Sequence, residues 1–109
     1  MRERKDLKLL NMVVNEYINI VEYLAQTEPI ENNRIVINRD HFRGLLEKYA
    51  YMKFNQKTKV YKQLNFIIHD KNNYTIPWKD RQTKKTIRKV IINYETYTII
   101  KHLSESEIS

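Results

Sequence analysis

A long run of apolar residues spaced three and four apart commits the N-terminal part of this chain to a single helix. The spacing is kept by Leu7, Leu10, Val14, Tyr17, Val21 and Leu24, and Leu9, Val13, Ile18 and Ile20 widen the stripe. Such a repeat predicts an amphipathic helix, which we place at about residues 6–26. Asp6 is the expected N-cap, and Pro29 ends the helix because the residue before a proline avoids helical backbone angles.

The stripe is wider than the core of one small domain usually covers, which leaves two interpretations open. The segment is either the longest core helix or a helix that also contacts a second copy of the chain. If it pairs, the homodimer interface consists of Leu7, Leu10, Val14, Tyr17, Val21 and Leu24. The C-terminal segment is the other apolar surface that a dimer can use.

Length and composition narrow the class of protein. The 109 residues predict one domain at 1–103 with a frayed tail at 104–109. The chain has no cysteine, which excludes thiol chemistry and Cys-based metal sites and favours the cytoplasm. A single glycine, Gly44, rules out glycine-rich phosphate loops. No export signal or membrane span is expected, because charged and amide residues interrupt every apolar run.

The middle of the chain predicts a strand and two helices. Arg34–Ile37 is β-branched and bounded by asparagines, as in a short strand. A second helix follows, capped by Asn38 or Asp40 and reaching about Tyr49, and its Gly44 suggests close approach of another backbone. A third helix is expected at about 56–69. Its apolar face is Val60, Leu64, Ile67 and Ile68, and its opposite face is Thr58, Lys62, Asn65 and His69.

The last third predicts a β-hairpin. Tyr74–Ile76 is a strand candidate, 79–85 is a polar basic loop, and Thr86–Ile92 can return antiparallel to the first strand. A helix also fits the spacing of Ile87, Val90, Ile91 and Tyr94, and residues 94–103 fit either a strand or a helix. The order helix, short strand, two helices and hairpin is that of an α+β winged helix-turn-helix domain.

Charge is concentrated in the same part of the chain. Between Lys53 and Lys89 there are eleven Lys or Arg and two Asp, a net +9, whereas the whole chain carries +7. Like charge gathered in one segment opposes compactness, so it indicates a polyanionic partner, with double-stranded DNA the first candidate. The predicted DNA-binding residues lie on the third helix and the hairpin: Lys57, Thr58, Lys59, Tyr61, Lys62, Asn65, Lys79, Arg81, Lys84, Lys85 and Arg88.

These residues divide into two roles. Most of the cations are expected to contact phosphates, which makes affinity fall steeply with salt. Thr58, Tyr61, Lys62 and Asn65 are expected to read base edges, and Arg81 to enter a narrow minor groove.

The segment Thr58–Asn65 resembles the T-V-Y-R-x-L run in recognition helices of the Fur family of winged-helix regulators, with Lys59 inserted between Thr58 and Val60. In size, in its Lys/Asn/Ile/Tyr-rich composition and in its expected wing, the chain resembles the TcpK family of relaxosome accessory proteins of clostridial conjugative plasmids. This resemblance implies an accessory factor that binds DNA at a transfer origin of a mobile element, beside a relaxase or another DNA-processing protein.

Other functions remain open on the residues alone. They are a winged-helix repressor, a single-strand or RNA binder that stacks bases on Tyr61, Tyr74 and Trp78, and an antirepressor-like protein-interaction module. No catalytic constellation is apparent, since the only serines lie in the C-terminal tail. The histidines His41, His69 and His102 are scattered, so we expect no metal and no cofactor.

Overall fold

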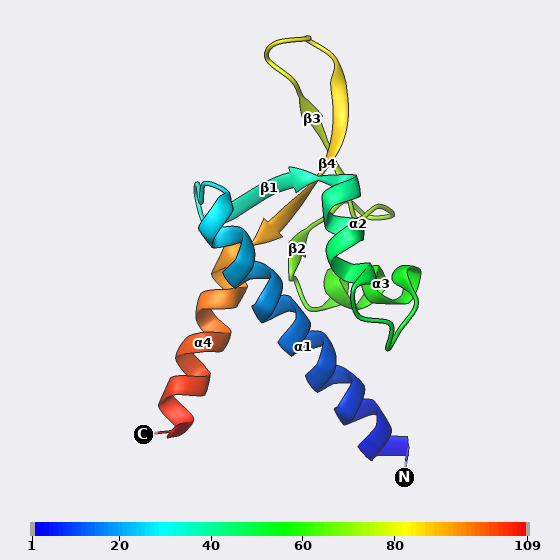
Figure 1. Ribbon diagram of the computed structural model, residues 1–109, viewed down its shortest axis with the longest axis vertical. Helices are drawn as coiled ribbons and strands as arrows, with labels where there is room; N and C mark the ends of the chain where they lie inside the picture. Colours follow the sequence, from blue (N-terminus) through cyan, green and yellow to red (C-terminus); the bar gives the residue numbers. More distant parts are fainter. Residues whose placement is uncertain (1, 109) are drawn as a thin grey trace.

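The computed structural model describes the backbone of residues 2–108 and the side chains of 7–105, and it is an α+β fold (Figure 1). The elements, in order, are α1 (Arg2–Thr27), β1 (Arg34–Asn38), α2 (Arg39–Glu47), α3 (Phe54–Gln63), β2 (Ile67–Ile68), β3 (Ile76–Lys79), β4 (Thr86–Asn93) and α4 (Tyr94–Ile108). The expected α+β class is confirmed. Among the described residues, no helix combines the length and apolar content needed to cross a bilayer.

The strand β4 organises the antiparallel sheet, because every other strand pairs with it. On one side, β1 runs along its C-terminal part, with Arg34 opposite Asn93 and Asn38 opposite Lys89. On the other side, β2 pairs with Ile91 and Ile92, and β3 pairs with residues 86–89. The β3–β4 hairpin therefore extends past the end of β1, and in Figure 1 it projects from the body at one end of the long axis.

The core lies between the helices and one face of the sheet. Side chains alternate between the two faces of a strand, so Ile35, Val90 and Ile92 share the inner face. Against them pack buried residues from α1 and α2: Val13, Tyr17, Ile20, Val21, Leu24, Phe42, Leu45 and Leu46. The aromatic rings of Tyr17 and Phe66 stack with centroids 3.9 Å apart within this core.

Two helices differ from the sequence prediction at their ends. The helix α1 starts at Arg2, so Asp6 lies inside it, and it ends before Pro29 as expected. The predicted third helix is too long, since α3 ends at Gln63 and Ile67–Ile68 form β2. Asn65 has φ = 58°, and the Phe66 and Asn65 amides donate to the carbonyls of Tyr61 and Lys62. These bonds form a Schellman motif, which needs a residue that tolerates left-handed backbone angles.

The structure of the C-terminal third decides between strand and helix for the two segments that the sequence left open, 86–92 and 94–103. Thr86–Asn93 is a strand and Tyr94–Ile108 a helix, so the expected frayed tail is helical as far as it is described. The first hairpin strand lies at 76–79 rather than 74–76. The expectation for Gly44 is wrong: a Cβ atom at this position would meet no atom within 4 Å.

Candidate nucleic-acid interface

The loop at the tip of the hairpin, residues 80–85, is built around Asp80. One carboxylate oxygen accepts the Gln82 amide at 3.0 Å and the other accepts the Thr83 hydroxyl at 3.0 Å. These bonds to the ionised form lower the pKa of Asp80 below its usual value. The Lys84 amide donates to the Asp80 carbonyl, and Lys84 has φ = 58°. Asp80 therefore folds the loop and is the acid nearest to its cations in sequence.

Four exposed cations surround this loop. Lys79 ends β3, and Arg81, Lys84 and Lys85 lie in the loop itself. Within residues 7–105, none of the ion pairs involves these four side chains. The hairpin tip is therefore a projecting patch of positive charge whose cations are free to meet an anion. The loop and the returning strand were predicted from the sequence with nearly these bounds, whereas the first strand was predicted at 74–76 and lies at 76–79.

Three of the contact residues predicted on α3 are buried. Lys57 and Tyr61 are almost completely buried and Thr58 is 6% exposed, so these three do not lie on an exposed DNA-binding surface. The Thr58 hydroxyl donates to the Asn55 carbonyl at 3.0 Å within the helix. The helical spacing did not predict the burial of Lys57, because a lysine is expected at the surface unless a buried partner for its charge is known.

The buried partner is Glu16 of α1. One of its carboxylate oxygens accepts Lys57 Nζ at 2.7 Å, and the other accepts the hydroxyls of Tyr61 at 2.8 Å and Tyr51 at 2.9 Å. Lys57 also donates to the carbonyls of Leu46 and Tyr49 at the end of α2. Burial, and then the neighbouring Glu16 charge, raise the pKa of Tyr61 and of Tyr51 well above the usual value.

The face of α3 that remains accessible is polar. Lys62 is half-buried, and the exposed residues are Asn55, Gln56, Lys59 and Gln63. Of these, Lys59 and Lys62 were predicted from the sequence, whereas Asn55, Gln56 and Gln63 were not among the predicted contact residues. Once Lys57 and Tyr61 are known to be buried, the helical spacing alone assigns Asn55, Gln56 and Lys59 to the outer face.

Two other predicted contact residues, Asn65 and Arg88, take part in contacts within the fold; the Asn65 side chain is exposed, so its DNA contact stays a prediction. The Asn65 carbonyl accepts the Asn93 side-chain amide at 3.0 Å and the Thr96 hydroxyl at 2.8 Å, so Asn65 joins α3 to the start of α4. Ile67, two residues after Asn65, pairs with Ile92 of β4. Ile92 lies about 20 Å along β4 from Thr86 at the hairpin tip, at about 3.3 Å per residue. Arg88 is half-buried and donates to the side chain and carbonyl of Thr75 at 2.7 and 2.8 Å.

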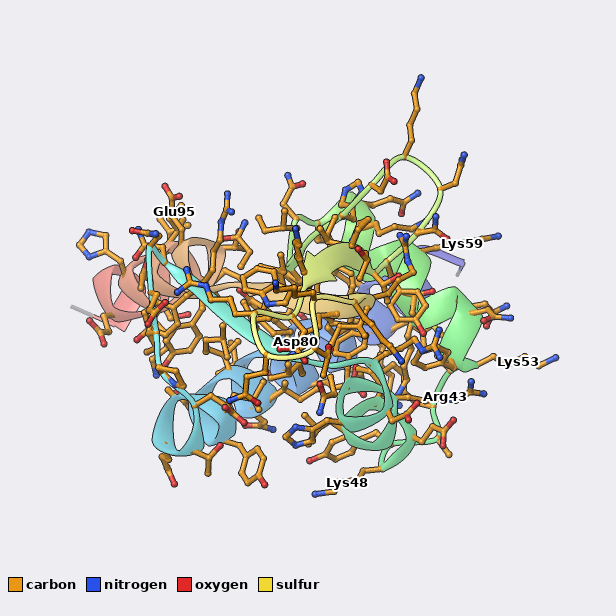
Figure 2. The ribbon with its side chains drawn as sticks, turned by 90° about the horizontal axis from the view of Figure 1, so that it is seen from above. Arg43, Lys48, Lys53, Lys59, Asp80 and Glu95 are labelled. Carbon is orange, nitrogen blue, oxygen red and sulfur yellow. The ribbon has the colours of Figure 1, made fainter. Side chains whose placement is uncertain are left out.

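The hairpin and α3 are separated by α2. In Figure 1, α2 lies between the base of the hairpin and α3. Figure 2, seen from above, shows Asp80 near the middle of the molecule while Lys59 and Lys53 extend to one side. A surface that joins α3 to the hairpin tip therefore crosses α2, where Arg39 is exposed. The single cationic surface expected from the sequence stays a prediction, with Arg39 as an added candidate.

Half of the predicted dimer interface belongs to the core. Tyr17, Val21 and Leu24 are fully buried, so they pack within the chain and are not available to a partner. Leu7 and Leu10 are 60% and 41% exposed, and Val14 is half-buried. In α4, Ile99 and Leu103 are also exposed. The apolar surface left open is the N-terminal half of α1 together with α4.

Comparisons with known proteins add no relative. No protein-family model matches the chain. A search of curated proteins likewise found no match. Within the described residues, no three His, Asp or Glu side chains come together in a way that could hold a metal ion.

Proposed function

We propose that this protein binds double-stranded DNA as a winged-helix domain, with the β3–β4 hairpin as its wing. The observation that carries the proposal is the hairpin tip, where Lys79, Arg81, Lys84 and Lys85 project together and take part in none of the ion pairs among residues 7–105. A polyanion gains from such a patch through release of condensed counterions. The order of elements, with β1 paired to the returning strand of the hairpin, agrees with this architecture.

The two parts of the surface serve different purposes in this proposal. Helix α3 presents Asn55, Gln56 and Lys59 near its N-terminal end, the end that recognition helices direct at base edges. Asparagine and glutamine amides pair bidentately with adenine, and lysine donates to guanine. The wing contacts phosphates, with Arg81 reaching the adjacent minor groove. Helix α3 then supplies sequence discrimination and the wing supplies affinity.

Binding across a salt series tests the proposal. Duplex DNA is expected to bind with a linear fall of log affinity against log salt, and to outcompete RNA and an acidic protein. Lys84→Ala/Lys85→Ala should weaken all duplex sequences alike and reduce the salt slope by about 2. A matched control is Lys8→Ala/Lys48→Ala, which removes two exposed charges away from the hairpin and should leave the slope unchanged. A loss confined to one sequence contradicts the phosphate role of the wing.

The biological setting follows from the DNA that the protein selects. We favour an accessory factor at the origin of a conjugative element, acting with a relaxase in the cytoplasm, and a repressor is the alternative. Recovery of bound fragments from host DNA separates the two, since an origin segment supports the first and the protein's own promoter supports the second.

A homodimer is part of the proposal, because operators and origins commonly offer paired half-sites. Its interface consists of Leu7, Leu10 and Val14 of α1 with Ile99 and Leu103 of α4. Leu10→Glu should convert a dimer to a monomer in sedimentation. Thr98→Glu places a similar charge at an exposed position of α4 next to Ile99, and its effect on the dimer shows whether the interface includes that part of α4. A wild-type chain that sediments as a monomer at all concentrations overturns the dimer.

A further inference from the structure

The outer face of the sheet carries an apolar strip that the core does not use. In the β3–β4 pair, Trp78 lies opposite Ile87 and Ile76 lies opposite Lys89. Because side chains alternate between the two faces of a strand, these four residues lie on the same face of the sheet as the paired residues Ile91 and Val36. Ile91 is buried, yet it lies outside the main core cluster, because it points away from the helices. Trp78 and Ile87 are each 40% exposed. A large aromatic ring is therefore presented on the open face of the hairpin.

Two neighbouring hollows meet at this ring. One, of about 690 Å³, runs toward the hairpin tip and is lined by Lys79, Arg81, Gln82 and Lys89. The other, of about 250 Å³, runs toward the loop between α1 and β1 and is lined by Pro29, Asn32 and Arg34. Trp78 and Glu31 line both hollows. The two hollows therefore adjoin at Trp78 and Glu31, and we call them together the groove; its hairpin end is lined by the cations Lys79, Arg81 and Lys89 and by the carboxylates of Asp80 and Glu31.

Of the three aromatic residues considered for base stacking, only Trp78 is free to stack. Tyr61 is buried in the Glu16 cluster. The ring of Tyr74 packs against Phe42 and Phe54, with centroids 6.0 and 5.5 Å apart. A base stacked on an aromatic ring gains about 1–3 kcal/mol of binding free energy, provided that one face of the ring is open.

We propose that the groove binds an unpaired nucleotide of single-stranded DNA, with its base stacked on Trp78 and the strand's phosphates on Lys79 and Arg81. The inference rests on the proposed function, since it adds a single-strand site to the outer face of the same wing. Asp80 lines this end too and stays ionised, since its carboxylate accepts the Gln82 amide and the Thr83 hydroxyl, but the three cations Lys79, Arg81 and Lys89 leave this end positively charged. The phosphates lie at the hairpin end, where Lys79, Arg81 and Lys89 outnumber the carboxylates of Asp80 and Glu31, whereas at the other end Glu28 and Glu31 outnumber Arg34.

The position of Glu31 adds a preference among bases. A carboxylate next to a stacked base accepts a hydrogen bond from an exocyclic amine, as it does from N4 of cytosine. Thymine carries a carbonyl oxygen where cytosine carries this amine, so a carboxylate positioned for N4 of cytosine gains no hydrogen bond there. Oligo(dC) should therefore bind more tightly than oligo(dT) of the same length, although the two bases have similar size.

Trp78 is the only tryptophan in the chain, so its fluorescence reports on this groove alone. Eight-residue dC and dT oligonucleotides and a blunt duplex are titrated at low and moderate salt. Single strands should quench Trp78 emission to saturation, and the duplex should bind with little quenching. Saturation of the protein by dC without a change in emission overturns the proposal. Duplex binding without single-strand quenching removes the Trp78 site alone, whereas single-strand binding without duplex binding refutes the proposed function instead.

Variants test the stacking and the base preference separately. Trp78→Leu keeps apolar contact with Ile87 but removes the ring, and it should weaken a labelled oligo(dC) by about 5- to 100-fold with duplex affinity unchanged. Glu31→Gln should reduce the dC preference, since an amide no longer offers a charged acceptor. The control is Tyr49→Ala, which removes another exposed aromatic ring, 44% exposed, and should change neither affinity. Equal oligo(dC) binding by wild type and Trp78→Leu contradicts the site.

Discussion

The ammonium group of Lys57 lies 2.7 Å from the carboxylate of Glu16, and both side chains are at most 2% exposed. The two residues are 41 positions apart, on α3 and α1. Lys57 also bonds to carbonyls at the end of α2, so one ammonium group connects three helices. Because the contact fixes Lys57 in the core, it determines which face of α3 remains outside.

Glu16→Gln should destabilise the protein by about 3–5 kcal/mol, because it leaves the Lys57 charge buried without a counter-ion. Urea unfolding followed by circular dichroism measures the change. The double variant Glu16→Gln/Lys57→Met should recover part of that loss, since no charge then remains buried.

The exposed pair Arg43–Glu47, at 2.7 Å, is the matched comparison for that prediction. Arg43→Ala should destabilise the protein far less than Glu16→Gln, because water screens the exposed pair. Equal costs for Arg43→Ala and Glu16→Gln would show that the buried pair has no special role.

Four tyrosines should ionise at a higher pH than free tyrosine does. Burial raises the pKa of Tyr17, Tyr51 and Tyr61 far above the usual value, and burial with Glu22 raises that of Tyr97 to about 12. In absorbance at the tyrosinate band, Tyr17, Tyr51 and Tyr61 should therefore ionise only as the protein unfolds at high pH. A single transition of all eight tyrosines in the folded protein contradicts this assignment.

The same shifts give stability a definite direction with pH. A tyrosine whose folded pKa is raised contributes its full share below the unfolded value of 10.0, and this share is lost as pH rises above it. The urea midpoint should fall above pH 10, and Tyr61→Phe should make that fall shallower. An unchanged slope in Tyr61→Phe would mean that Tyr61 does not contribute to it.

Gly44→Ala should stabilise the protein by about 0.5–1 kcal/mol, because glycine within a helix loses more backbone entropy than alanine. The added Cβ meets nothing within 4 Å, so no steric cost offsets this gain. Thermal unfolding measures the shift. A lowered melting temperature would restore the view that this glycine serves a close contact.

The hairpin was predictable from the sequence because its signals are local. β-branched residues flank a polar loop with Asp80 at its start, and both are readable without knowledge of the rest of the chain. For residues 86–92 the spacing allowed both a strand and a helix, and the structure shows the strand β4.

The buried face of α3 was not predictable, because it depends on a residue in another helix. A lysine and a tyrosine enter the core only where Glu16 supplies a charge and an acceptor, and no helical period reports that partner. The end of α3 was missed for a related reason: Asn65 was interpreted by its side-chain chemistry, whereas its φ of 58° makes it a helix terminator.

Asp80 offers a test in which charge and loop structure act in opposite directions. Asp80→Asn keeps an oxygen for the Gln82 amide and removes the negative charge beside the hairpin cations. Duplex affinity should then rise about two- to fivefold at low salt.

Asp80→Ala removes the same charge but also removes both hydrogen-bond acceptors, so the loop becomes less ordered. Ordering the loop on DNA then costs conformational entropy, and this cost offsets the gain in affinity from the lost negative charge. Fluorescence anisotropy of labelled duplex measures affinity, and hydrogen exchange of the Lys84 amide, which donates to the Asp80 carbonyl, measures loop order. If Asp80→Ala binds as tightly as Asp80→Asn while that amide exchanges faster, a preformed loop is unnecessary and only the cations' charge matters for binding.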